Sequence, residues 1–305
     1  MKYRITHRSL YRYSGDVVLC HNIARLLPRE THWQHCLPSR LTIRPNPAFS
    51  IERLDFFGNR TLYFVIQDIH QELEVIASSK VQVRDARPLG LSSLSPPWEQ
   101  ALQLLRENSQ PETIEARQFT LDSPFVTVRP HFRDYAAPSF PPGRPLLEAV
   151  GDLNRRIHEE FTYDPHFTTI ATPLEQVLSQ RRGVCQDFAH LAITCLRALG
   201  LAARYVSGYL ETRPPPGKPR LVGADASHAW LAVYVPSIGW AEFDPTNACL
   251  PGEGHITLAW GRDYGDVAPL TGVMTGGGSH TLDVSVDVEP QPEGDRSDAK
   301  AAARP

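Results

Sequence analysis

The sequence lacks a long hydrophobic run and a strong net charge, and each absence excludes a class of protein. No apolar stretch approaches the roughly 18–20 residues that a membrane-spanning helix needs. The formal net charge is −3 at pH 7, so no basic surface for nucleic acid or an anionic membrane is expected. The first residues also lack the apolar segment of a signal peptide. We therefore expect a cytoplasmic protein that binds neither nucleic acid nor a membrane.

The sequence also lacks a disulfide framework and the motifs of a metal or nucleotide site. Its five cysteines are odd in number, widely spaced and free of any CxxC pair. The histidines and cysteine within residues 32–36 do not match a standard zinc site. No glycine-rich phosphate loop and no EF-hand loop occurs. We expect free thiols, most of them small buried hydrophobes, and no metal or cofactor.

The length of 305 residues suits two domains, and the patterns change along the chain accordingly. Residues 1–85 contain short stretches of alternating aromatic and β-branched residues, for example at 3–13, separated by turn signals. This pattern predicts an all-β domain, an antiparallel sandwich or barrel. Residues 86–145 are punctuated by prolines and contain one clear helical stretch at 98–107. We interpret this region as a connector with a short helix or two.

Residues 146–290 have a mixed helical and stranded pattern. The clearest helix covers 184–199, where apolar residues form one stripe and Gly200 follows as a C-cap. Strands are expected at 203–210, 228–235, 240–244 and 282–288. The sequence therefore predicts an α+β core with a C-terminal strand over 146–290. The polar tail, residues 291–305, is expected to be disordered.

Cys185 stands at the start of the helix predicted over 184–199. A thiol in the first turn faces the positive end of the helix dipole and unpaired backbone N–H groups, and both favour the thiolate. The same N–H groups can donate to an oxyanion that forms beside the sulfur. Cys195 lies on the apolar stripe of the same helix and has neither advantage. The helix thus contains one cysteine placed for chemistry and one placed for packing.

A thiolate nucleophile needs a base, and the base needs a group that orients it. His228 opens one predicted strand and Asp244 closes the next, with residues 236–239 as the expected loop. With a four-residue loop and regular pairing, the two side chains would point to opposite faces. We therefore predict an odd loop length or a bulge, which places His228 and Asp244 on one face.

Each of these residues alone has a simpler interpretation. A histidine at the start of a strand is more often structural, and an aspartate before proline is more often a turn former. The combination is more specific than its members. A cysteine at a helix start, followed by a histidine and an aspartate on paired strands, favours a catalytic triad of Cys185, His228 and Asp244.

Four segments resemble motifs of the bacterial transglutaminase-like superfamily: residues 183–187, 200–209, 228–230 and 239–246. The resemblance implies a papain-like α+β core, in which the helix bearing the cysteine packs on an antiparallel sheet. It also implies that the β-rich first region matches the N-terminal region of the same bacterial proteins. By the resemblance, Cys185 aligns with the nucleophile, His228 with the base and Asp244 with the orienting carboxylate.

The resemblance and the chemistry of the triad together imply an enzyme that acts on a peptide or protein substrate. It would cleave or transfer acyl groups at peptide or isopeptide amide bonds through a thioester, with hydrolysis favoured. Protein-glutamine amine transfer, a small-molecule amidase and a non-catalytic binding module stay open as alternatives. Gln186, Asp187 and Tyr209 are candidates for substrate binding or the oxyanion site. The oligomeric state is not predicted.

Overall fold

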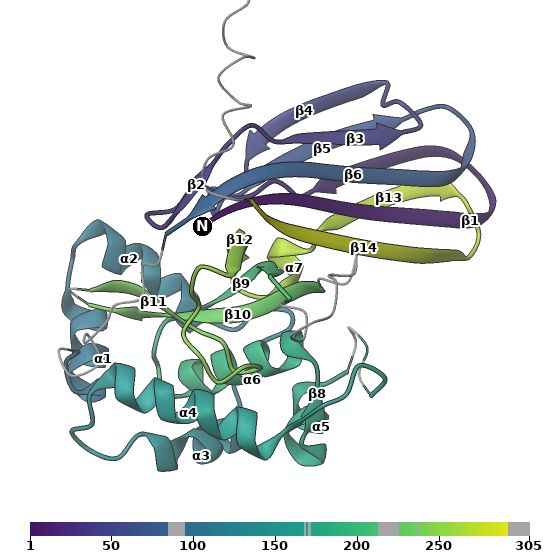
Figure 1. The fold of residues 1–305 in the computed structure, drawn as a ribbon. Helices are drawn as coiled ribbons and strands as arrows, with labels where there is room; N and C mark the ends of the chain where they lie inside the picture. The colour runs from purple at the N-terminus through teal and green to yellow at the C-terminus, as the bar shows by residue number, and fades with distance from the viewer. Residues whose placement is uncertain (85–94, 168, 170–171, 213–225, 237, 292–305) are drawn as a thin grey trace, which may run out of the picture.

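The computed structural model describes residues 1–84, 95–167, 169, 172–212, 226–236 and 238–291. The chain forms two packed parts (Figure 1). The first, called the β unit, comprises residues 1–84 and 270–291. The second, called the core unit, comprises the described residues of 95–267. No helix in the described ranges combines the length and the apolar character needed to cross a bilayer.

The β unit is an eight-stranded antiparallel sheet, as the alternating pattern of residues 1–85 predicts. Its strands are β1 (Lys2–Ala24), β2 (Gln34–Cys36), β3 (Arg40–Arg44), β4 (Phe49–Leu54), β5 (Arg60–Ile66), β6 (His70–Val83), β13 (Leu270–Gly276) and β14 (His280–Gln291). The long strand β1 pairs first with β6 and β14, and then with β5 and β13. It therefore organises the whole sheet.

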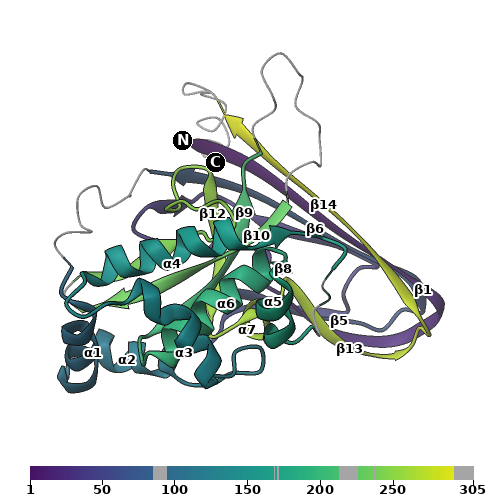
Figure 2. The ribbon, with the colours of Figure 1, turned by 90° about the horizontal axis from the view of Figure 1, so that it is seen from below.

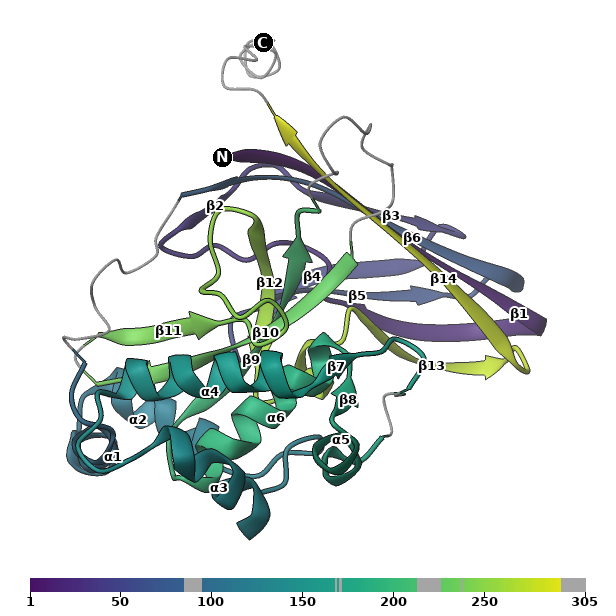
Figure 3. The same ribbon diagram turned by 60° about the horizontal axis from the view of Figure 1, so that its bottom comes forward.

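The two C-terminal strands belong to the β unit, which differs from the expected division of the chain. The sequence pattern placed residues 282–288 with the core over 146–290. Instead, β14 pairs with β1 from Lys2↔Gln291 to Tyr13↔His280, and the two strands run side by side in Figures 2 and 3. The alternation identifies the strand correctly, but a period of two does not specify which sheet the strand joins.

The core unit has a four-stranded antiparallel sheet in the order β11-β10-β9-β12. Its strands are β9 (Ala203–Leu210), β10 (Ala226–Val235), β11 (Gly239–Phe243) and β12 (His255–Gly261). Its helices are α1 (Trp98–Glu107), α2 (Pro111–Arg117), α3 (Pro130–Ala136), α4 (Leu146–Glu160), α5 (Leu174–Gln180), α6 (Cys185–Ala198) and α7 (Tyr264–Val267). A two-stranded pair, β7 (Thr162–Tyr163) with β8 (Arg182–Gly183), precedes α6. Figure 1 shows α3, α4 and α6 on one side of the sheet and the β unit on the other.

The expected connector, residues 86–145, is more structured in its described part than its prolines indicate. Helix α1 forms where it is predicted, but α2 and α3 also form, and each has a proline in its first turn. A proline there costs nothing, because its missing N–H has no partner in a helix start. Phe132 and Ala136 of α3 are fully buried in the main core. The prolines therefore begin helices as well as separating them.

Helix α6 packs as its apolar stripe predicts. Phe188, Leu191, Cys195 and Leu196 are all buried in the main hydrophobic cluster. The helix ends before Gly200, whose φ of +83° lies in the left-handed region that glycine tolerates. The α6 stripe faces the core sheet and leaves the first turn at the surface of the core unit, where the β unit approaches.

Candidate active site

Cys185 is the first residue of α6, after the N-cap residue Val184. The Asp187 carboxylate accepts a hydrogen bond from the Val184 backbone N–H at 2.8 Å, which stabilises the helix start. A Cβ at Gly183 would lie 2.9 Å from the Asp187 side chain, so the approach requires glycine. The Cys185 thiol is free and half-buried. The Gly-Val-Cys-Gln-Asp segment thus builds a helix start that presents a thiol.

The hairpin of β10 and β11 has the register that the sequence predicts. The pairing runs from Leu231↔Phe243 to Val235↔Gly239, which leaves residues 236–238 as a loop of odd length. Continuing this register puts Asp244 opposite Trp230, on the same face as His228. The His228 Nε2 and Asp244 Oδ2 atoms are 2.8 Å apart. The predicted departure from the simplest hairpin is confirmed.

Asp244 is completely buried, with 0% of its surface exposed, and both of its oxygens accept hydrogen bonds. Its Oδ2 accepts from His228 Nε2 at 2.8 Å, from His255 Nε2 at 3.1 Å and from Asn247 Nδ2 at 2.6 Å. Burial raises the pKa of Asp244, but these donors outweigh burial and hold that pKa well below its usual value. The carboxylate therefore stays ionised at neutral pH inside the protein.

The other oxygen of Asp244 forms a turn. Its Oδ1 accepts from the backbone N–H groups of Thr246 at 2.9 Å and Asn247 at 3.3 Å. This is the geometry of an aspartate that initiates a turn. The interpretation of Asp244 as a turn former is therefore confirmed, and its other oxygen is left to contact the histidines.

His228 is 8% exposed and lies between the buried carboxylate and the thiol. Burial lowers the pKa of His228, but hydrogen bonds to Asp244 and Cys185, with the charges of both groups, raise it to about 9. The ring therefore favours the imidazolium form at neutral pH. The proton of His228 is therefore placed beside the sulfur of Cys185, where a leaving group on an attacked carbonyl carbon could accept it.

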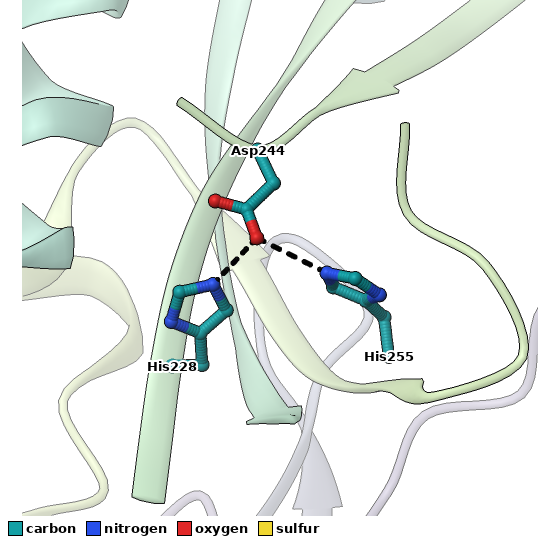
Figure 4. A group of neighbouring side chains, drawn as sticks. All are labelled: His228, Asp244 and His255. Atoms are coloured by element: carbon teal, nitrogen blue, oxygen red, sulfur yellow. Dashed lines mark hydrogen bonds and ion pairs between the residues drawn. The ribbon is translucent and has the colours of Figure 1, made fainter. Parts of the chain in front are cut away.

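His255 is a site residue that sequence reasoning missed. It opens β12, and its Nδ1 accepts from the Gly252 backbone N–H at 3.3 Å. The neutral ring therefore carries its proton on Nε2 and donates it to Asp244 Oδ2. Figure 4 shows both histidine rings directed at this one oxygen. An isolated histidine after a loop gives no sequence signal, because only the placement of β12 beside β9 brings it to Asp244.

His228, Asp244 and His255 are also a donor set that can hold a metal, since their ligand atoms lie within 4.8 Å of one another. A metal would bind the Nε2 lone pair of each histidine, and each ring would then carry its proton on Nδ1. At His255 this conflicts with the Gly252 N–H that donates to Nδ1. The described hydrogen bonds therefore fit a proton-holding cluster better than a metal site.

A pocket of about 280 Å³ contains Cys185 and His228. Gln186, a predicted site residue, lines it beside the thiol. Asp187 is buried and caps α6, as described above, and it lines a neighbouring pocket instead. Tyr209 is 1% exposed and does not line the active-site pocket among the described residues. Its hydroxyl lies 2.9 Å from His7 Nδ1, one layer behind the pocket wall.

The fold and the site define a papain-like α+β protein with a cysteine at a helix start and a histidine–aspartate pair on the adjoining sheet. The family model of the transglutaminase-like superfamily matches residues 134–245. The model of the bacterial transglutaminase-like N-terminal region matches residues 3–82. The chain belongs to the bacterial transglutaminase-like superfamily.

Several relatives are similar over most of the chain. A Mycobacterium tuberculosis protein is 46% identical over 297 residues, 95% of this chain and 93% of the relative. A Mycobacterium leprae protein is 32% identical over 288 residues, 93% of this chain and 97% of the relative. The protein-glutamine gamma-glutamyltransferase of Pseudomonas aeruginosa is 28% identical over 174 residues, 51% of this chain but 25% of that protein.

A solved structure supports the fold of the whole chain. It is that of a Cytophaga hutchinsonii protein described as a candidate cysteine protease, with a TM-score of 0.72 and 20% identity. The match covers 96% of this chain and 92% of that one. The likeness therefore extends to the arrangement of the β unit against the core unit.

Proposed function

We propose that the protein is a cysteine-nucleophile enzyme that acts on amide bonds through a thioester at Cys185. The observation that carries this proposal is the position of His228, between a thiol at a helix start and a carboxylate that is buried and ionised. A non-catalytic binding module is the weaker candidate. Binding alone does not require an imidazolium that is buried and hydrogen-bonded to an ionised carboxylate.

Cys185, His228 and Asp244 have different roles in the proposed reaction. The Cys185 thiolate attacks the carbonyl carbon, and the first-turn N–H groups of α6 can donate to the oxyanion that forms. His228 gives its proton to the leaving amine as the C–N bond breaks, which leaves a thioester and a neutral imidazole. His228 then takes a proton from the second nucleophile, and the C–S bond breaks. Asp244 keeps the ring oriented in both steps.

The second nucleophile separates hydrolysis from amine transfer. We favour water, and therefore cleavage of a peptide or isopeptide bond in a peptide or protein substrate. The description of the Cytophaga protein agrees with this choice. The name of the Pseudomonas relative favours the second candidate, transfer of the acyl group of a protein glutamine to an amine. Both candidates share every step up to the thioester.

A mass-spectrometric comparison of wild-type protein with Cys185→Ala tests whether Cys185 is the nucleophile and whether water or an amine is the second nucleophile. Each is incubated with mixed peptides, with and without a primary amine. We expect product only from the wild-type protein, because a methyl side chain cannot form a thioester. Cleavage alone identifies a peptidase, and a mass increase equal to the added amine minus ammonia identifies a transferase.

The matched control is Cys36→Ala, which removes a half-buried thiol of the β unit. It should retain wild-type activity. If Cys185→Ala and wild-type protein give the same products, catalysis at Cys185 is wrong.

A further inference from the structure

The β unit supplies one wall of the active-site pocket. His7, Ser9 and Tyr11 of β1 line it together with Leu282 and Val284 of β14. In the β1–β14 register, Ser9 pairs with Val284 and Tyr11 pairs with Leu282. Direct partners in an antiparallel pair project from the same face of the sheet. One face of this strand pair is therefore directed at the pocket that contains Cys185. Figures 2 and 3 show β1 and β14 side by side.

A second pocket of about 250 Å³ continues this wall away from the thiol. It shares Tyr11 and Leu270 with the active-site pocket. Tyr13, Met274 and His280 line its far part. Tyr13 and His280 are the next pair in the same register. The two pockets adjoin at Tyr11 and Leu270, and together they are called here the β1–β14 groove, which begins at Cys185.

Apart from Cys185 and His228, the described lining of the β1–β14 groove carries no carboxylate, ammonium or guanidinium group, and it is more apolar than polar. Among the described residues that line the two pockets there is no aspartate, glutamate, lysine or arginine. Leu282 and Val284 are 50% and 46% exposed, although they are aliphatic. Tyr11 stacks on Tyr13 with a centroid distance of 6.4 Å, which adds an aromatic surface. Exposed apolar surface of this kind in a concave site is typical of a binding groove.

The opposite face of the same strands has the opposite character. The Arg8 guanidinium forms an ion pair with the Glu74 carboxylate at 2.7 Å, and Arg12 forms one with Glu72 at 3.2 Å. Asp283 lies 4.0 Å from Arg8 on this face. Charged residues are therefore common on these strands, but they alternate away from the groove. The neutrality of the groove is a property of that face and not of the β unit as a whole.

The wall is also fixed to the core unit. His7 Nδ1 lies 2.9 Å from the Tyr209 hydroxyl of β9, and its Nε2 lies 2.9 Å from Ser9 Oγ. Burial lowers the pKa of His7 to about 4, so this ring is neutral at physiological pH. The hydrogen bonds hold the groove in place relative to Cys185, so a substrate meets a preformed surface.

We propose that the β1–β14 groove binds an uncharged segment of the substrate, with aromatic or aliphatic side chains, next to the amide that Cys185 attacks. The proposal rests on the proposed function and gives its substrate class. Burying a charged side chain against these residues would leave the charge unpaired, which is unfavourable. Apolar side chains would instead cover Leu282, Val284 and the tyrosine rings.

The test uses three acetylated tripeptide chloromethyl ketones that end in glycine and differ in the other two side chains. One carries leucine and phenylalanine, one carries two glutamates and one carries two lysines. The rate at which each alkylates Cys185 is measured by mass spectrometry and divided by the rate with iodoacetamide. We expect the apolar probe to react about tenfold faster than either charged probe on this scale.

Leu282→Glu places a carboxylate in the groove, and Thr281→Glu places one on the other face of the same strand. Leu282→Glu should abolish the preference for the apolar probe and favour the lysine probe over the glutamate probe. Thr281→Glu should behave as the wild-type protein. Equal relative rates for the three probes, or equal effects of the two variants, would overturn the proposal.

Two further measurements distinguish a failure of the groove from a failure of the proposed function and from self-association of the chain. If iodoacetamide labels Cys185 no faster than Cys36, the proposed function fails, whereas the probe ratios still report on the groove. If sedimentation shows that wild-type protein is a dimer and Leu282→Glu a monomer, the groove is an interface between two copies of the chain. That outcome also overturns the proposal.

Discussion

At the scale of single side chains, the two hydrogen bonds that Asp244 Oδ2 accepts from His228 and His255 organise the candidate site. His228 is raised in pKa and His255 donates from a fixed tautomer, so the buried charge is compensated on both sides. The position of Cys185 at a helix start and the contact between His228 and Asp244 could be predicted from sequence, because each residue follows a local signal, a helix start or the end of a strand. His255 could not, because its contact depends on where a distant strand lies.

The raised pKa of His228 predicts how stability depends on pH. A group whose pKa is higher in the folded state binds its proton more tightly there, so it stabilises the fold below its unfolded pKa of about 6.5. That contribution, about 3 kcal/mol, should be lost as the pH rises from about 6.5 through about 9. Urea unfolding at pH 6 and pH 9.5 measures it.

The matched variant is His228→Gln, which keeps a donor to Asp244 but does not titrate. It should lose less stability than wild-type protein over the same interval. An equal loss in both proteins would show that the His228 proton is not bound more tightly in the fold.

Among the elements, α6 and the β10–β11 hairpin were predictable, and the strands of the β unit were predictable only in part. Periodicity specifies the apolar stripe of α6. The requirement that His228 and Asp244 share one face predicts an odd loop or a bulge in place of the four-residue loop, and the structure has an odd loop at 236–238. The pairing of β14 with β1 joins residues that are far apart in the chain. No local pattern encodes such a pairing. Helix α3 is not predicted, for a different reason: the proline in its first turn is interpreted as a separator of elements.

At the start of α6, the lack of a side chain at Gly183 makes room for the Asp187 carboxylate. Gly183→Ala would place a Cβ 2.9 Å from the Asp187 side chain and displace the carboxylate that caps the helix. We expect a loss of about 1–2 kcal/mol in the free energy of unfolding, together with slower alkylation of Cys185. Urea unfolding and mass spectrometry measure the two effects.

Gly15→Ala is the control, because a Cβ there meets only atoms at 3.9 Å. It should change neither quantity. If Gly183→Ala behaves in the same way as Gly15→Ala, the contact between Gly183 and Asp187 does not position the thiol.

In the whole molecule, the two units share a hydrophobic cluster and are joined by hydrogen bonds from side chains of one unit to the backbone of the other. The main hydrophobic cluster contains Tyr3 and Val288 of the β unit together with residues of the core unit. The Gln34 side chain donates to the Thr257 carbonyl at 2.7 Å and accepts from its N–H at 2.9 Å. Asn59 pairs with the Trp260 backbone in the same way. Two side-chain amides thus act as strand partners for β12.

This sharing predicts that the protein unfolds as one cooperative unit. Gln34→Leu removes both hydrogen bonds to Thr257 and takes away the acceptor of the Thr257 N–H, which should cost about 2–4 kcal/mol, although the Thr257 carbonyl still accepts from the Arg29 N–H at 3.3 Å. Urea unfolding should still show a single transition, shifted to lower urea. Gln71→Leu, at an exposed position of β6, should shift it by less than about 0.5 kcal/mol.

Two transitions, only one of them moved by Gln34→Leu, would contradict a shared core. The β unit would then be a separate domain beside the core unit, and the groove wall would lack a fixed position.

The most direct test of the central claim is the alkylation of Cys185 by iodoacetamide at pH 6, compared with Cys36 in the same molecule. Burial raises the pKa of Cys36 to about 11, so that thiol is an internal standard that is almost fully protonated. We expect stoichiometric labelling of Cys185 well before Cys36, and labelling about 100-fold slower in Asp244→Asn. Labelling of Cys185 that is no faster than that of Cys36, or is unchanged in Asp244→Asn, would contradict an activated thiolate at this site.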